Sequence, residues 1–167
     1  DIKVGEVVQI EGKVELRRGS IQVESDVIRP LSGEYCDAIL EKISLVVYEK
    51  ARPDKFESIE EGLVDYASAE RAATEIRMAI LESIPIIIRH PATVDGHIAG
   101  ATIEHSIIRQ VEEEYGQIQA IHRHVDRRPY QSNGQEMNAA ILDTSRMLES
   151  QLRYSDPVPL YIFLSLI

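Results

Sequence analysis

Residues 99–129 are AGATIEHSIIRQVEEEYGQIQAIHRHVDRRP, and they predict the central unit of the fold. Apolar residues recur there at three- and four-residue spacing, which is typical of one face of an amphipathic helix: Ile103, Ile107, Ile108, Val111 and Tyr115. Gly116 predicts the end of that helix, because glycine takes the left-handed C-cap conformation at little cost. The segment QIQAIHRHVD that follows favours a strand closed by Pro129. A helix with Glu104 near its start therefore leads directly into a strand.

The composition is typical of one soluble globular domain over residues 1–167, with 44% hydrophobic and 28% charged residues. The net charge of −10 disfavours nucleic acid and anionic membranes as partners, because their phosphates would repel the chain. No apolar run approaches the roughly 18 residues that a membrane span needs, and no signal peptide is visible at the first residues. Cys36 is the one cysteine, so an internal disulfide is excluded, which suits the cytoplasm.

The chain before this unit predicts a hairpin, a strand and a helix. Apolar and polar residues alternate over residues 8–17, which indicates a half-buried strand, and a second strand follows over 21–27. Residues 34–42 are left open between a short helix and a loop. Residues 43–48, ISLVVY, are rich in β-branched and aromatic side chains and predict a strand. The alanine-rich segment 66–83 predicts a helix with an apolar stripe.

Three further segments complete the predicted architecture. The apolar run 84–88 contains Pro85, and periodicity leaves open whether it is a buried strand, an edge strand or a helix tail. Residues 137–152 predict a helix. The hydrophobic tail within residues 155–167 must be buried, either as a strand of its own domain or against a partner. This order indicates an α+β fold, a mainly antiparallel sheet with helices on one face.

Several short motifs resemble the tunnelling-fold pterin enzymes, and dihydroneopterin aldolase most of all. The motifs are VVQIEGKVELRRG with Glu24 after it, KISLVVYEK, LVDYASAE with Tyr66, TIEHSIIRQV with Glu104, and AIHRHVDRRP ending at Arg128 and Pro129. The resemblance implies a small enzyme that binds a pterin or purine-like heterocycle at a subunit interface, as a metal-free aldolase or lyase with no cofactor. GEVVQIEGKVELR and IQAIHRHV also resemble the large subunit of molybdopterin synthase.

The resemblance further implies roles for four residues. Glu104 and Glu24 would bind the heterocycle, and Tyr66 and Arg128 would be catalytic. Arg128 departs from the family, which has lysine there, and arginine keeps its proton at neutral pH. Two of these residues also have a structural interpretation. The negative charge of Glu104 near the start of its helix interacts favourably with the helix dipole, and Tyr66 is a half-buried packing residue.

The five histidines lie within residues 90–124, and two of them suggest a metal site. His122 and His124 are two apart on the predicted strand and so share a face. A metal site needs three or four converging donors, and nothing in the sequence brings the others there. Metal binding by His122 and His124 is therefore an alternative to solvated or core histidines.

Two classes of function follow. The first is a cytoplasmic enzyme acting on a pterin or purine-like heterocycle. The second is a non-catalytic homo-oligomeric assembly or scaffold protein. In either class the apolar tail predicts a homo-oligomer, because residues 160–167 carry seven apolar side chains out of eight.

Overall fold

The computed structural model describes residues 2–3, 6–17, 20–53, 65–116, 124–130, 136–154 and 157–164. The chain divides into two compact units, Asp1–Val46 and Val47–Ile167. The prediction of one domain over residues 1–167 stays a prediction.

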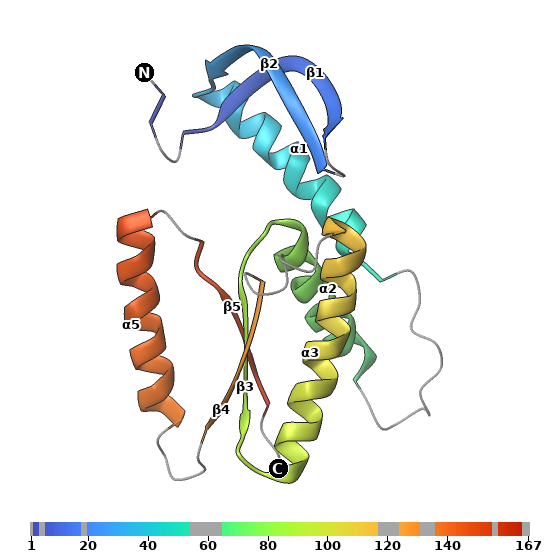
Figure 1. Ribbon diagram of the computed structural model, residues 1–167, viewed down its shortest axis with the longest axis vertical. Coiled ribbons are helices and arrows are strands. Elements are labelled where there is room, and N and C mark those ends of the chain that lie inside the picture. Colours follow the sequence, from blue (N-terminus) through green and yellow to red (C-terminus); the bar gives the residue numbers. More distant parts are fainter. Residues whose placement is uncertain are drawn as a thin grey trace. The chain divides into compact units, whose positions relative to one another are not determined.

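The first unit is built on an antiparallel hairpin of β1 (Val8–Arg17) and β2 (Ser20–Pro30), which confirms the predicted hairpin (Figure 1). The register shifts between Glu11 and Gly12, and a Cβ on Gly12 would collide with the carbonyl oxygen of Glu24. Glycine is thus required at this bulge. The apolar face predicted to point inward is largely exposed, with Val14 at 71% and Leu16 at 73%.

Helix α1 (Glu34–Ala51) follows the hairpin and corrects one prediction, because the ISLVVY segment belongs to it. Acidic side chains in its first turn and Lys50 in its last turn complement the helix dipole. The β-branched residues of ISLVVY lower helix propensity only slightly, and a long helical context overrides that preference.

The second unit contains a three-stranded parallel sheet in the order β4-β3-β5. Its elements in chain order are α2 (Tyr66–Leu81), β3 (Ile86–Pro91), α3 (Val94–Tyr115), β4 (Val125–Tyr130), α5 (Glu136–Tyr154) and β5 (Leu160–Phe163). The α+β class is confirmed for the chain as a whole. Among the described residues, however, antiparallel pairing occurs in the hairpin alone, so this sheet differs from the mainly antiparallel one predicted.

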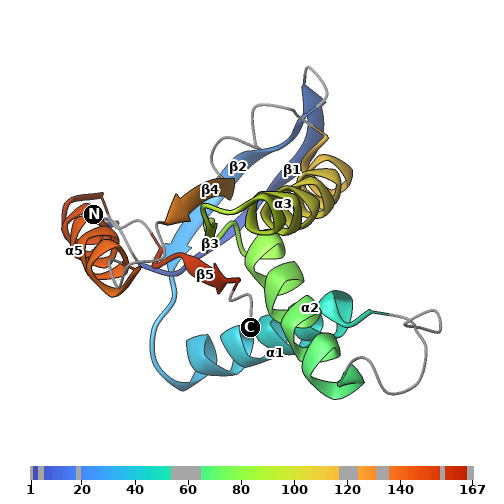
Figure 2. The ribbon, with the colours of Figure 1, turned by 90° about the horizontal axis from the view of Figure 1, so that it is seen from below.

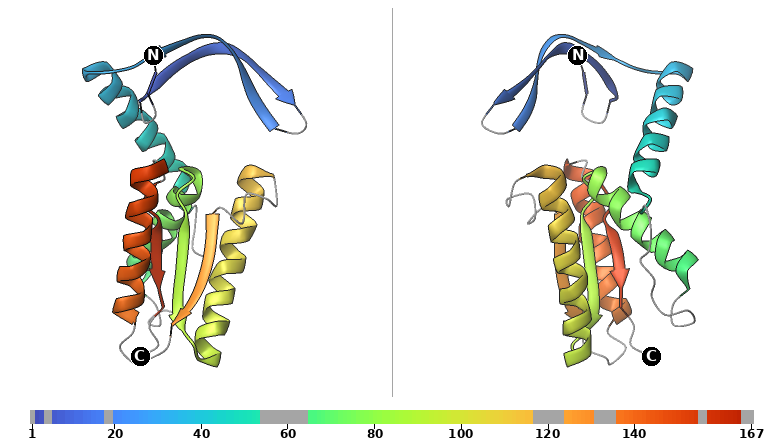
Figure 3. Two further views of the ribbon diagram at one scale, coloured as in Figure 1. Left: turned by 60° about the vertical axis from the view of Figure 1, so that its left-hand side comes forward. Right: turned by 90° about the vertical axis from the view of Figure 1, so that its right-hand side faces the viewer.

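Helices cover both faces of the parallel sheet, not one face as predicted (Figure 3). Ile86 and Ile88 pack against Ile107 and Val111 of α3, whereas Arg89 faces α5. The alternation of side chains along β3 produces this division. All six residues of β3 are buried, as expected for a central strand covered on both faces.

The observed bounds of the helices and strands can be compared with the predicted segments. Helix α2 confirms the predicted helix 66–83 to within two residues, and β3 resolves the ambiguous apolar run as a buried strand. Helix α3 begins at Val94, five residues before the stretch 99–129 from which the helix was predicted, because Thr93 serves as its N-cap. Residues 160–163 pair with β3 of their own sheet, so at least this part of the tail completes its own unit. The predicted homo-oligomer stays a prediction.

Asp65 is the N-cap of α2, and its removal should weaken that helix in a pH-dependent way. Its carboxylate accepts from the Ser68 hydroxyl at 2.5 Å and from the Ala67 amide at 3.2 Å. The Ser68 bond is the main reason that the pKa of Asp65 lies below its ordinary value. The stabilisation is therefore full above the ordinary pKa and is lost as the pH falls through the lowered one. Asp65→Ala should lower the melting temperature at neutral pH and have a much smaller effect in strong acid, as measured by circular dichroism.

Candidate functional site

The carboxyl ends of β3, β4 and β5 meet at one edge of the parallel sheet, viewed from below in Figure 2. Helix α3 connects β3 to β4, and α5 returns the chain past β3 to β5. The connection from β3 to β4 and the connection from β4 to β5 therefore run in opposite directions along the sheet. In open parallel sheets, ligands bind outside the carboxyl ends of the strands at such a switch point.

Two glycines let α3 approach β3 very closely at this edge. A Cβ on Gly96 would collide with the carbonyl oxygen of Pro91, and one on Gly100 would lie 2.6 Å from Cδ2 of His90. His90 is fully buried beneath the helix. The glycine spacing of four residues places both on one face of α3, and this face determines how near its N-terminus lies to the sheet.

Arg127 of β4 is the centre of a polar cluster on the α3 face. Its Nε donates to Oε2 of Glu104 at 2.6 Å, and its Nη1 lies 3.1 Å from Nε2 of His90. Nη1 also lies 3.5 Å from Nδ1 of His97, an exposed residue in the first turn of α3. Side chains from two turns of α3 and from β3 therefore contact the guanidinium group of Arg127.

The hydrogen bonds define which nitrogen of His90 carries the proton. Nδ1 of His90 lies 2.8 Å from the carbonyl oxygen of Pro91, which can only accept. Nδ1 is therefore assigned as the donor, and Nε2 accepts from Arg127. The rings of His90 and His97 meet edge to face, with centroids 4.7 Å apart.

The α5 face of the sheet carries a second, separate cluster of charges. Arg89 forms a buried ion pair with Asp143, whose other oxygen lies 3.0 Å from Nη1 of Arg128. Arg128 also pairs with Asp126 at 2.6 Å. Burial, with a further contribution from the positive charge of Arg128, lowers the pKa of Arg89 from its usual value. This cluster fixes α5 to the sheet.

The structure places the sequence-predicted site residues on different elements. Glu104 binds Arg127 on the α3 face, whereas Arg128 lies on the α5 face. Tyr66 is the first residue of α2, and Glu24 lies on β2 of the other unit, opposite Lys13. The four residues therefore belong to four different elements.

Of the two histidines proposed as a metal site, the structure describes His124 alone. His124 is buried and stacks on Tyr115 with ring centroids 4.8 Å apart, whereas His122 lies outside the described residues. Among the described residues, no three histidine, cysteine or acidic side chains are grouped so that they could hold a metal ion.

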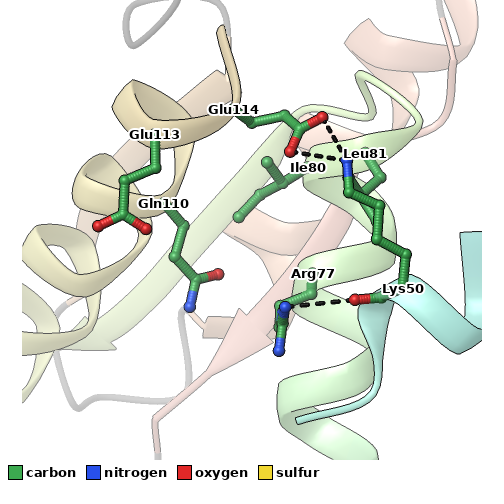
Figure 4. A pocket seen from close by; sticks show the side chains of 7 residues that line it. All are labelled: Lys50, Arg77, Ile80, Leu81, Gln110, Glu113 and Glu114. Atoms are coloured by element: carbon green, nitrogen blue, oxygen red, sulfur yellow. Dashed lines mark hydrogen bonds and ion pairs between the residues drawn. The ribbon is translucent and has the colours of Figure 1, made fainter. Parts of the chain in front are cut away.

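A hollow of about 290 Å³ lies apart from the carboxyl edge, between α2, α3 and the last turn of α1 (Figure 4). Lys50 closes one side of it by binding the Glu114 carboxylate at 2.7 Å. Arg77 donates to the carbonyl oxygens of Lys50 and Arg52 at 3.2 and 3.3 Å, which caps the end of α1. These charged groups are engaged in joining the helices, so the hollow is a helix junction and not the candidate site.

Sequence reasoning missed Arg127 as the centre of the site. A signal for the site was present in IIIRHPATVDGHIAG, residues 86–100. An apolar run is followed there by an N-cap threonine and by two glycines four residues apart. Together these features predict a strand, a tight turn and a closely packed helix. Only the pairing of β4 with β3 brings Arg127 to that turn.

Comparisons with known proteins identify relatives that are much longer than this chain. No family model matches the sequence. The chain is 30% identical over 171 residues to an uncharacterized protein, MJ1198, of Methanocaldococcus jannaschii, and the match covers 98% of this chain but 22% of that protein. In fold it is similar to a solved structure named as the DHH domain of PF0399, a member of a family of ribosomal proteins. The TM-score is 0.69 and the identity 28%, over 80% of this chain and 31% of the other.

These findings correct the resemblance to the tunnelling-fold pterin enzymes, which was wrong. The structural neighbour is a DHH domain, and no finding supports a tunnelling fold, a pterin ligand or a lyase activity. The motifs behind the resemblance were short, and one of them, KISLVVYEK, forms a helix. None of the helices in the described part of the chain combines the length and the apolar character that a membrane span requires.

Proposed function

We propose that the second unit binds a phosphate ester of the nucleotide class at the carboxyl edge of its parallel sheet. The observation that carries the proposal is the position of Arg127 beside the first turns of α3, which opens at this edge. The first amides of a helix lack intrahelical partners and, together with the helix dipole, favour anions. A guanidinium group beside them adds the planar donors that recognise phosphate.

The remaining features of the edge are compatible with this ligand. Exposed His97 offers a ring nitrogen next to Arg127, and Thr93 caps the helix through the Gly96 amide at 3.1 Å. The net charge of −10 disfavours contacts along a polyanion, but one phosphate needs only this local cluster. A cytoplasmic location remains part of the proposal.

Isothermal titration calorimetry on the intact chain tests the proposal. The probes are a nucleoside monophosphate, its nucleoside and inorganic phosphate, each with and without magnesium, because the Asp95 carboxylate lies in the first turn of α3. The monophosphate should bind measurably more tightly than the nucleoside. Arg127→Met should weaken its binding by about tenfold or more, since hydrogen bonds to charged groups are worth about 1.5–3 kcal/mol.

The matched control is His105→Ala, which removes an exposed histidine from the same helix. This variant should bind the monophosphate as the parent does. Equal affinity for nucleoside and monophosphate, or an Arg127→Met variant that is folded and binds normally, would exclude the proposed site.

A further inference from the structure

We propose that Glu104 is a positioning residue, which holds the Arg127 guanidinium in the orientation that binds the phosphate. The proposal rests on the phosphate site described above and adds the residue on which the geometry of that site depends. Glu104 was expected to bind a ligand itself. In the structure its Oε2 instead accepts from Nε of Arg127 at 2.6 Å.

The contacts of Arg127 divide its donors into two groups. Nε is held by Glu104 of α3, and Nη1 lies near the ring nitrogens of His90 and His97. Among the described residues, no hydrogen bond engages Nη2. The engaged donors of the guanidinium are thus Nε and Nη1. The N–H groups of Nη2 are left to bind an anion.

The surroundings of the Arg127 stem are rigid on one side. Its Cδ packs over Gly100, where a Cβ would lie 3.2 Å away, and His90 beneath it is fully buried. Glu104 lies one helical turn beyond Gly100 and holds the guanidinium through Nε. The ion pair is partly exposed, at 27% for Arg127 and 28% for Glu104, so a ligand can reach it. Without Glu104, the long side chain would regain alternative rotamers.

A positioning role and a purely electrostatic role predict opposite changes in the affinity for phosphate when the Glu104 carboxylate is removed. If Glu104 acts only through its negative charge, it repels phosphate, and both Glu104→Ala and Glu104→Gln should bind phosphate more tightly. If Glu104 positions Arg127, Glu104→Ala should bind more weakly despite the lost negative charge. Glu104→Gln keeps an oxygen that accepts from Nε and should retain most of the affinity.

The experiment measures binding of a nucleoside monophosphate by calorimetry for the parent, Glu104→Ala and Glu104→Gln. The expected result is a loss of about tenfold or more for Glu104→Ala and a change within about threefold for Glu104→Gln. Glu112→Ala is the control, because it removes an exposed carboxylate further along α3 that holds no described side chain. Its affinity should be equal to that of the parent or slightly higher.

An NMR measurement separates positioning from a general loss of structure. The Nε–H signal of Arg127 should be protected from exchange in the parent and in Glu104→Gln, and should lose that protection in Glu104→Ala while the amide spectrum of α3 is retained. If the parent binds and Glu104→Ala binds as tightly or more tightly, the positioning role is wrong but the phosphate site stands. If the parent binds no phosphate ester, the proposed function and this role both fall.

Discussion

Replacing Asp143 by alanine should destabilise the protein by about 3–5 kcal/mol, because it removes the carboxylate that pairs with the buried Arg89 guanidinium. The side chains of Arg89 and Asp143 are 7% and 8% exposed, and Asp143 also binds Arg128. Arg89 lies on the central strand and cannot reach water without opening the contact between α5 and the sheet. Urea unfolding followed by circular dichroism measures the change in the free energy of unfolding.

Asp126→Ala is the matched control for this prediction. Asp126 also pairs with Arg128, but its side chain is 51% exposed. An exposed ion pair contributes about 0–1 kcal/mol, so this variant should remain near the parent. Similar losses for the two variants would show that burial does not determine the contribution of Asp143.

Gly96→Ala should destabilise the second unit by about 3 kcal/mol or more, although alanine in a helix normally stabilises relative to glycine by roughly 1 kcal/mol. The added Cβ would meet the backbone carbonyl of Pro91, which cannot rotate away as a side chain can. Helix α3 would have to move off β3 and disturb the packing over His90. The melting temperature and the urea midpoint measure the loss.

Ala101→Gly provides the contrast, because Ala101 is exposed on the same helix. It should lose about 1 kcal/mol through helix propensity alone. Should Gly96→Ala instead be as stable as the parent or more stable, the close approach of α3 to β3 described here would be incorrect.

Elements whose signals are local could be predicted from the amino-acid sequence. The periodic stripes of α2 and α3 and the alternation in β1 were identifiable because a helix or a hairpin satisfies its backbone within a few residues. Gly116 ends α3 in the left-handed conformation, as predicted, with φ of 63°. Where the local signal and the wider context disagreed, as in ISLVVY, the local signal misled, because propensity is weak beside the continuation of an already formed helix.

The pairing of the strands, and hence the location of the site, follows from tertiary contacts alone. The direction and order of β4, β3 and β5 depend on contacts between segments far apart in the chain, about which the periodicity of each strand carries no information. That pairing brings Arg127 to His90 and Glu104, and it places Arg128, the next residue, with Asp143 on the opposite face. Two adjacent arginines that look equivalent in the sequence therefore have different surroundings, since neighbouring residues of a strand point to opposite sides of the sheet.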